Sequence, residues 1–412
     1  MTPTVLFYCI IGILVFDFLL NEVLSFLNYT WYSKPIPAVL SDVYKQEEYE
    51  KSQAYKKERF KFGTLNSFIS IVGILVFIFL DGFALVDQWC RSITNNETVV
   101  SLLFFGVLFM ASDLLTTPLS YYSTFVIEEK YGFNKTTKKL FFLDKIKGWF
   151  MTLILGGGLL TVLILIYNWA DSNFWWHAWI VIFIVSILLN MFYARLIVPI
   201  FNKQAPLEQG SLRDKISEYA NQVGFELTKI FVIDGSKRST KANAYFSGFG
   251  SEKRVTLYDT LIDQLTEEEI VAVLAHEVGH YKKKHILYNL LAGTLTTGFT
   301  LYLFSLVVDS DLMAQALGVS NSSFHIGLVA FFLLYSPISM VTSIFMNILS
   351  RKFEYQADAY AVRTYKAAPL ITGLKTLTKT SLSNLTPHPA VVWFQYSHPS
   401  LLQRITAMQK IN

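Results

Sequence analysis

Residues 276 to 280 read His-Glu-Val-Gly-His, a string that predicts a metal site. Two histidines four positions apart lie on one face of a helix, where both imidazoles can bind a single Zn²⁺ ion. Glu277 is rotated by about 100° from His276 and can reach a water molecule on the metal. The chemistry expected of His276, Glu277 and His280 is therefore zinc-assisted hydrolysis of a peptide bond. The alternative is a surface helix with incidental histidines, in a chain that holds only seven.

A catalytic zinc site needs three protein ligands and one open position, so a third ligand must lie elsewhere. His285 lies nine residues beyond His276, about 180° round the same predicted helix, and no glycine after His280 would turn the chain. We expect His285 to pack or to lie at the membrane interface. Glu354 is the better candidate, because Asp358 follows it by one helical turn and can orient a ligating histidine. The alternative for this pair is an ordinary helix end with salt bridges.

The helix that carries both histidines is predicted to begin at Glu267. Thr266 followed three residues later by Glu269 forms a capping box, which is typical of a helix N-terminus. The chain before it, from residue 200 onwards, is the first stretch that resembles a soluble domain.

That domain is expected to combine helix and sheet. An amphipathic helix is predicted over residues 211–223, with Ser211 as its N-cap and Gly224 just beyond its end. Three short β-prone runs follow, separated by turn-rich segments at 234–236 and 248–251. The runs lie at residues 230–233, 242–246 and 254–258.

Composition places the rest of the chain in a membrane. Hydrophobic residues make up 52% of the sequence and charged residues only 16%, which excludes an ordinary soluble enzyme. Apolar runs long enough to cross about 30 Å of hydrocarbon indicate seven spans. They lie near residues 4–27, 65–86, 99–124, 149–169, 175–199, 286–308 and 324–348.

Basic residues predict the orientation of these spans. The loops near residues 87–98, 170–174 and 309–323 hold only Arg91, whereas two other loops are rich in lysine. We therefore expect the N-terminus outside, and the basic loops and zinc site in the cytoplasm. The C-terminal residues carry no endoplasmic-reticulum retrieval signal, which favours a bacterial inner membrane over the endoplasmic reticulum. The basic residues concerned are Lys34, Lys45, Lys51, Lys56, Lys57, Arg59 and Lys61 in the first loop, and Lys130, Lys135, Lys138, Lys139, Lys145 and Lys147 in the second.

These patterns divide the chain into four parts. Residues 1–200 are expected to form five transmembrane helices with basic cytoplasmic loops, and residues 201–285 a cytoplasmic zinc-protease domain. Residues 286–350 should form two further transmembrane helices, and residues 351–412 a cytoplasmic C-terminal segment that completes the zinc site. The predicted fold class is thus an α-helical multi-pass membrane protein with a small α+β metalloprotease domain at the cytoplasmic end.

Several fragments together resemble the type I CAAX prenyl proteases, the farnesylated-protein-converting enzymes. Members of that family are integral-membrane zinc metalloproteases that trim C-terminal tripeptides from farnesylated proteins and process some substrates further upstream. The resemblance implies one Zn²⁺ ligated by His276, His280 and Glu354, Glu277 as general base, and seven helices that enclose a large water-filled chamber. The fragments are Tyr131-Gly132-Phe133-Asn134, Asn243-Ala244-Tyr245, His276 to His280, Arg351 to Asp358, and His398-Pro399 with Arg404-Ile405.

The resemblance also assigns roles outside the metal ligands. His398 is the candidate donor to the oxyanion of the reaction, because Pro399 can start a helix and leave His398 at its N-terminal edge. Arg404 could pair with Asp358, with Glu354 or with a substrate carboxylate. Asn243, Ala244 and Tyr245 resemble the family's edge strand, to which an extended substrate adds as another strand.

Two other functions remain open at this point. A heat-shock-type membrane metalloprotease would use the same zinc motif to degrade misfolded membrane proteins, but that type has fewer spans before its zinc domain. A transporter or lipid-binding protein with a structural zinc would need a fourth ligand, and no further histidine or cysteine is suitably placed. The expected partners are a peptide or lipidated-protein substrate and the lipid bilayer. No nucleic acid and no obligate protein partner is expected.

Overall fold

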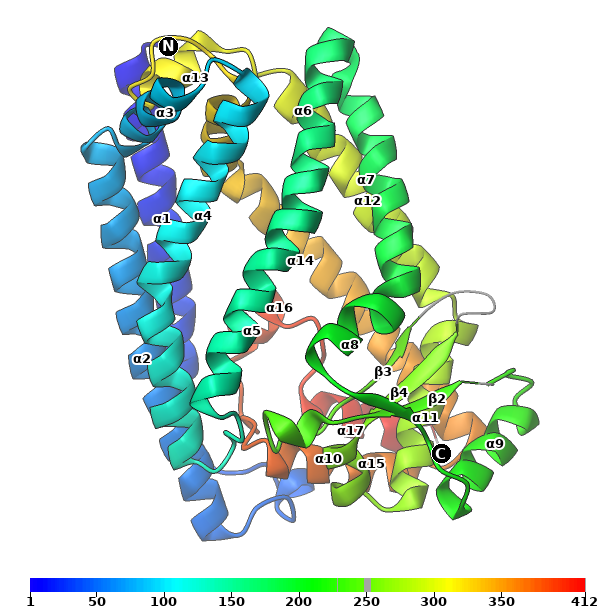
Figure 1. Ribbon diagram of the computed structural model, residues 1–412. Helices are drawn as coiled ribbons and strands as arrows, with labels where there is room; N and C mark the ends of the chain where they lie inside the picture. The colour runs from blue at the N-terminus through cyan, green and yellow to red at the C-terminus, as the bar shows by residue number, and fades with distance from the viewer. Residues whose placement is uncertain (228, 248–252, 412) are drawn as a thin grey trace.

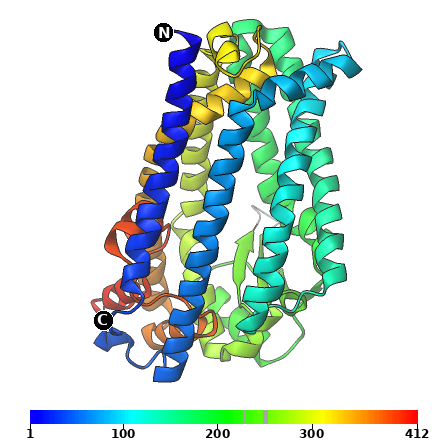
Figure 2. The same ribbon diagram turned by 90° about the vertical axis from the view of Figure 1, so that its left-hand side faces the viewer.

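The computed structural model describes residues 1–227, 229–247 and 253–411, and helices dominate it (Figure 1). Within these residues, seven helical segments are long and apolar enough to cross a membrane, as the sequence predicts. The termini lie at opposite ends of the molecule in both views (Figures 1 and 2). The seven segments are α1 (Pro3–Trp31), α2 (Gln46–Phe79), α4 (Glu97–Tyr122) extended to Glu128, α5 (Lys138–Met151) with α6 (Gly158–Ala170), α7 (Phe174–Phe192) with α8 (Val198–Phe201), α12 (His285–Ser305) and α14 (Phe324–Thr364).

Two helices extend well beyond the apolar runs from which they were predicted. α2 begins at Gln46, so Lys56 and Arg59, which were expected in a loop, are helical. A capping box between Lys45 and Glu48 starts this helix, and the lysine and glutamate residues that follow are good helix formers. Hydropathy detects only the part of a helix that crosses the hydrocarbon, so it misses such extensions. α14 likewise continues past its apolar run to Thr364.

Short helices close the end of the molecule that carries the N-terminus. α3 (Gly82–Ile93) and α13 (Asp311–Ala316) lie there, and α13 packs against α1 (Figure 1). Phe83, Phe104 and Ile326 belong to the apolar cluster that joins these elements. This end is opposite the one that holds the small sheet.

The small domain is built on a four-stranded sheet with the order β1-β2-β4-β3. β2 (Ile230–Ile233) and β4 (Arg254–Tyr258) pair in parallel and match the predicted strands. β3 (Ala244–Ser247) pairs antiparallel with β4 and forms an edge, beginning two residues later than predicted. β1 (Gln204–Pro206) was not predicted, because three residues are too few to show a period. The turn expected at 248–251 lies outside the described residues.

The predicted amphipathic helix is α9 (Ser211–Gln222). Gly224 follows it with φ +59°, the left-handed conformation expected just after a helix. The prediction that Ser211 is the N-cap is wrong. Gly210 occupies that position, and the Ser211 hydroxyl instead donates to the Glu267 carboxylate of a neighbouring helix. A contact with another element thus competes with local capping.

The core of this end surrounds α11 (Glu267–Lys282), which starts with the predicted Thr266 capping box. α11 packs against α14, α9 and α15 (Ala367–Thr380). Gly279 lets α11 and α14 approach closely, because a Cβ there would lie 3.1 Å from the Cα and carbonyl oxygen of Ala357. This close approach brings the histidine-bearing face of α11 against the Glu354 face of α14.

Candidate metal centre and active site

The side chains of His276, His280 and Glu354 converge on one point. One nitrogen from each histidine and one carboxylate oxygen all lie within 4.8 Å of one another. His276 and His280 come from successive turns of α11, and Glu354 comes from α14, which crosses it. His276 and Glu354 are buried, at 7% and 4% exposure, so the group is largely withdrawn from bulk water.

The second nitrogen of His276 has a partner that fixes its tautomer. His276 Nδ1 lies 2.9 Å from Asp358 Oδ1. A carboxylate can only accept, so Nδ1 carries the proton and donates it to Asp358. Nε2 of His276 is then left with a free lone pair aimed at the common point.

His280 is oriented in the same way through His285. His285 Nε2 donates to the Gln356 side-chain oxygen at 2.8 Å, which leaves Nδ1 of His285 as an acceptor. His280 Nδ1 lies 3.0 Å from that atom and therefore donates to it. Nε2 of His280 is again the bare nitrogen, so both histidines present the atom that a metal requires.

The distances fit a small cation held between these atoms. The two bare Nε2 atoms are 3.1 Å apart, and they lie 3.5 and 3.3 Å from the Glu354 oxygens. Ligands about 2.0–2.1 Å from a tetrahedral zinc ion are separated by about 3.3 Å. Glu354 Oε2 is buried without a hydrogen-bond donor among the described residues. Three lone pairs that face one another without a proton between them are costly unless a cation joins them.

Asp358 links the histidine to the C-terminal segment. Arg404 donates from Nε to Asp358 Oδ2 at 2.9 Å and from Nη2 to Oδ1 at 2.6 Å. Burial disfavours the arginine charge, but this carboxylate outweighs that effect and raises the pKa of Arg404. Nη1 of Arg404 also lies 3.5 Å from Glu354 Oε2. The expected pairing of Arg404 with Asp358 and Glu354 is therefore present in the structure.

Glu277 and His398, the two predicted catalytic residues, both act on the group: the charge of Glu277 is felt by His280, and His398 contacts Glu354. Glu277 is partly exposed on α11, and its carboxylate has no hydrogen-bond partner in the described part of the chain. His398 Nε2 lies 3.3 Å from Glu354 Oε1, although the His398 side chain is 64% exposed. The prediction that Pro399 starts the next helix is wrong. Ser400 is the N-cap of α17 (Leu401–Gln409), because a capping box with Gln403 provides a better start.

His285 has a larger part in this site than the sequence indicated. The expectation that one straight helix runs through it is wrong, because α11 ends at Lys282 and Lys284 adopts φ +61°. α12 then begins at His285, which is 1% exposed and stacks on Phe353 with ring centres 4.1 Å apart. The packing role that we expected is confirmed, and the contact with His280 is added to it. The turn could not be predicted from the sequence, because a lysine and not a glycine adopts the left-handed backbone conformation there.

Asn243, Ala244 and Tyr245 lie at the start of the edge strand. Ala244 pairs with Leu257, and Tyr245 pairs with Thr256. The Asn243 carbonyl accepts from Tyr258 N at 3.0 Å and starts the ladder. In the sheet order the other long side of β3 has no strand beside it within the described residues.

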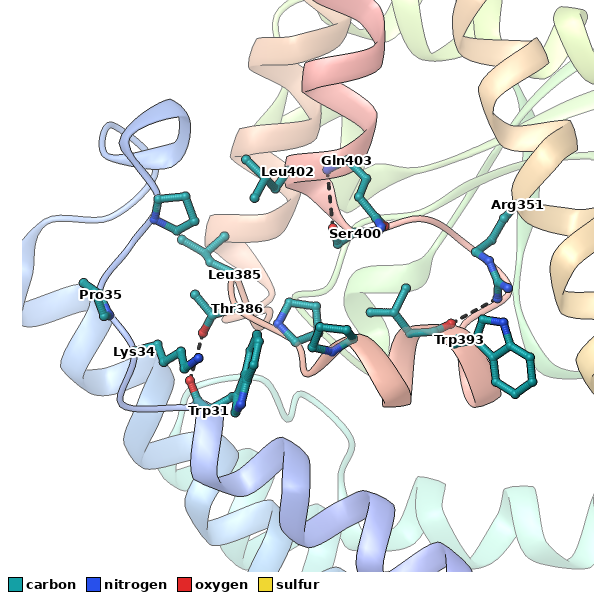
Figure 3. Close-up of a pocket in the computed structure, with 14 residues that line it drawn as sticks. Trp31, Lys34, Pro35, Arg351, Leu385, Thr386, Trp393, Ser400, Leu402 and Gln403 are labelled. Carbon is teal, nitrogen blue, oxygen red and sulfur yellow. Dashed lines mark hydrogen bonds between the residues drawn. The ribbon is translucent and has the colours of Figure 1, made fainter.

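A cavity of about 510 Å³ is lined by residues on both sides of the His398 loop, among them Trp393 and Ser400 (Figure 3). Arg351 forms part of its wall and donates to the Val392 carbonyl at 3.0 Å and the Tyr396 carbonyl at 2.5 Å. These bonds anchor α16 (Pro389–Gln395) and the following loop to α14, three residues before Glu354. No sequence pattern predicts this anchor, because its acceptors are backbone carbonyls far along the chain.

Comparisons with known proteins agree with this geometry. Residues 25–203 match the model of the CAAX prenyl protease N-terminal region with five membrane helices, and residues 206–412 match peptidase family M48. CAAX prenyl protease 1 of Saccharomyces cerevisiae is 36% identical, over 94% of this chain and 92% of that protein. The Arabidopsis thaliana CAAX prenyl protease 1 homolog is also 36% identical, over 97% and 96%.

A solved structure shows the same architecture over the whole length. The crystal structure of Ste24p from S. mikatae matches with a TM-score of 0.93 and 34% identity, and covers 98% of this chain and 99% of that one. The predicted fold class, seven membrane helices that enclose a chamber with a small α+β domain at one end, is thereby confirmed. Five membrane helices before the protease domain also disfavour the heat-shock type. The chain therefore belongs to the type I CAAX prenyl protease family within peptidase family M48, as a multi-pass membrane metalloprotease.

Proposed function

We propose that this protein holds one Zn²⁺ at His276, His280 and Glu354 and cleaves prenylated, CAAX-type polypeptides at the membrane. The observation that carries the metal assignment is the convergence of three lone pairs, from His276, His280 and Glu354. The other ring nitrogens of the two histidines are already engaged by Asp358 and His285. Two imidazoles and one carboxylate, three protein ligands and not four, form the ligand set of catalytic rather than structural zinc.

Residues of the chain then have separate roles in hydrolysis. Zinc bound here would lower the pKa of a water molecule and polarise the scissile carbonyl. Glu277, which has no other partner in the described chain, takes a proton from the attacking water and passes it to the leaving amine. His398 stands beside Glu354 and donates to the oxygen that gains negative charge. Arg404 keeps Asp358 ionised, so that His276 stays in the tautomer with Nε2 bare.

The substrate is proposed to bind as an extended strand along β3. The edge at Asn243 to Tyr245 offers backbone donors and acceptors to any sequence, so affinity comes from the main chain. The names of the relatives describe them as CAAX prenyl proteases, which supports a prenylated substrate for this chain as well. An apolar chain on the substrate would also concentrate it in the bilayer, where the enzyme resides.

We also propose that the metal centre faces the cytoplasm and the N-terminus the opposite side. Basic residues gather at the end of the molecule that holds the small domain, which supports this orientation by the positive-inside rule. The choice of a bacterial inner membrane remains a prediction, and the relatives named above come from yeasts and a plant.

The test is cleavage of a farnesylated peptide ending in a CAAX sequence by the purified protein. We expect Glu277→Gln to reduce turnover by at least about 100-fold, because it removes the general base. Bound zinc should stay at one ion per chain, because Glu277 is not a ligand. The same peptide without its lipid should be cleaved less efficiently. Persistent cleavage by Glu277→Gln would contradict the role of Glu277 as general base. Equal cleavage of the farnesylated and the unmodified peptide would contradict the preference for prenylated substrates.

A further inference from the structure

The chain that leads into the edge strand, residues 238–243, is anchored from the side of the small domain. The Thr260 hydroxyl donates to the Lys241 carbonyl at 3.2 Å, and the Gln264 amide donates to the Thr240 carbonyl at 2.7 Å. Thr260 and Gln264 belong to α10 (Asp259–Gln264), which follows β4 directly. These bonds fix the backbone of the lead-in against the sheet.

The opposite side of the same lead-in is held by the loop after α4. Thr240 N donates to the Phe133 carbonyl at 3.1 Å, and Lys135 N donates to the Arg238 carbonyl at 3.0 Å. Asn134 and Ser239 form an isolated β-bridge between these bonds. The Tyr-Gly-Phe-Asn string of the sequence is therefore part of the support of the edge strand.

The Lys241 side chain extends this support to two spanning helices. Its Nζ donates to Glu128 Oε2 at 2.8 Å, at the end of the third span, and to the Tyr55 hydroxyl of α2 at 3.2 Å. Tyr55 donates in turn to Glu128 Oε1 at 2.6 Å. The ammonium also lies 4.3 Å from the centre of the Phe133 ring. Tyr55 and Phe133 are each 4% exposed, so the contact is partly shielded from water.

We propose that Lys241 is a positioning residue for substrate binding, which holds the edge strand in register with the membrane helices through Glu128 and Tyr55. This inference rests on the proposed function, in which the substrate adds to β3. Lys241 lies three residues before Ala244, so a shift of the lead-in moves the first backbone groups that a peptide would bond. The metal-binding helices α11 and α14 are not part of this cluster.

Because the Lys241 cluster lies outside the metal-binding helices, we expect its loss to change substrate affinity and not the rate of the chemical step. Loss of the Lys241 ammonium leaves the lead-in held by its backbone bonds alone, without the tie to Glu128 and Tyr55. The bound peptide must then restrict the remaining motion of the strand. That cost appears in the affinity and not in turnover of the bound substrate. Arg59 lies 3.7 Å from Glu128 Oε1, so Glu128 keeps a cationic neighbour when Lys241 is replaced and the fold is preserved.

The experiment compares Lys241→Met with wild type in the cleavage of the farnesylated peptide. Methionine keeps the length of the side chain and removes its charge. We expect KM to rise roughly three- to tenfold, the effect of one partly exposed ion pair, while kcat changes less than about twofold. Lys241→Arg should restore a KM near the wild-type value. Lys379→Met is the matched control, because it breaks an ion pair with Glu48 of α2 in which the lysine is about as exposed as Lys241. Neither residue belongs to the lead-in or to the loop that holds it.

A binding measurement and a second variant complete the test. In the Glu277→Gln background, Lys241→Met should weaken binding of the uncleaved peptide by the same factor. Glu128→Gln should raise KM similarly, and the double variant with Lys241→Met should cost no more than either single change. An unchanged KM in Lys241→Met, a parallel fall of kcat and zinc content, or additive effects of the two changes would each overturn the proposal.

These outcomes are distinct from failure of the proposed function. If wild type does not cleave the farnesylated peptide, the substrate assignment is wrong whatever the variants do. If wild type cleaves it and Lys241→Met has the same KM and peptide affinity, only the positioning role is wrong.

Discussion

His285 illustrates how one buried side chain can decide whether its neighbour binds metal. Its Nε2 donates to Gln356, so its Nδ1 must accept the proton that His280 carries on Nδ1. Without that acceptor, His280 could place its proton on Nε2 and lose the lone pair that faces Glu354. The identity of residue 285 therefore bears on the metal affinity although it is not a ligand.

We predict that His285→Phe weakens zinc binding by roughly 10- to 100-fold, the range found when the partner of a ligating histidine is removed. Phenylalanine keeps the stacking on Phe353, so the loss would come from the missing acceptor and not from a cavity. The measurement is a zinc titration of metal-free protein against a competing chelator. His177→Phe is the control, since His177 Nδ1 bonds the Asn173 carbonyl at the start of its own helix and is far from the metal centre in sequence and in the fold. Equal affinity in wild type and His285→Phe would refute this role.

At the scale of elements, a buried polar network joins three helices at the end far from the metal centre. His325 at the start of α14 donates from Nε2 to Asp87 Oδ1 of α3 at 2.8 Å, and its Nδ1 accepts from Ser101 of α4 at 2.9 Å. Arg91 donates to both Asp87 oxygens at 3.0 and 3.1 Å. His325 is fully buried and Asp87 is 3% exposed, so both depend on this network for their hydrogen-bond partners.

The pH dependence of this network follows from Asp87. Burial raises the pKa of its carboxyl, but the hydrogen bonds from His325 and Arg91 outweigh burial and hold the pKa below its ordinary value. The unfolded carboxyl titrates near about 3.9. Because the folded pKa is the lower one, ionised Asp87 stabilises the fold at all pH values above about 4, and that stabilisation is lost as the pH falls through the folded pKa.

We predict that Asp87→Asn lowers the melting temperature at pH 7 by a few degrees, since a buried network loses its charge. The difference from wild type should shrink as the pH falls from about 4 through the lower folded pKa of Asp87, where the wild-type carboxyl becomes protonated as well. Thermal unfolding in detergent across this pH range is the measurement. Glu97→Gln is the control, because Glu97 pairs with the same Arg91 but its side chain is 58% exposed. A pH-independent difference for Asp87→Asn would contradict the assignment.

At the scale of the whole molecule, the metal centre joins segments that are distant in sequence. α11 supplies two of the predicted ligands, α14 supplies the third, and α17 reaches both Asp358 and Glu354 through Arg404. A metal held there bonds the small domain to the last spanning helix. Its removal should therefore affect global stability and not only activity.

We predict that a chelator abolishes cleavage and lowers the melting temperature of wild type by a few degrees. Zinc at a hundredfold excess over its dissociation constant contributes about 2.7 kcal/mol. Re-addition of zinc should restore both properties. Glu354→Ala should melt at the same temperature with and without chelator, because it has lost a ligand. A chelator-insensitive wild type, or Glu354→Ala that responds to zinc as wild type does, would contradict the ligand set.

The sequence determined much of the architecture by local rules. Seven apolar runs predicted the seven spans, since the bilayer requires about 20 apolar residues in each helix. Thr266 and Glu269 fixed the start of α11 through local capping, and the spacing of His276 and His280 fixed their common face. The same helical period predicted that Glu354 and Asp358 share one helix face. This prediction holds because α14 continues past its membrane run and includes both residues. Each of these features depends on residues a few positions apart.

Tertiary structure alone decided which of these residues meet and what holds them. Gly279 brings α11 against α14, the left-handed Lys284 turns the chain so that His285 returns to His280, and Arg351 anchors the His398 segment through backbone carbonyls. Lys241 and Glu128, like His325 and Asp87, form pairs across more than a hundred positions. Periodicity and capping act within a helix or strand, whereas these contacts depend on the angle and distance between packed elements, which no local pattern encodes.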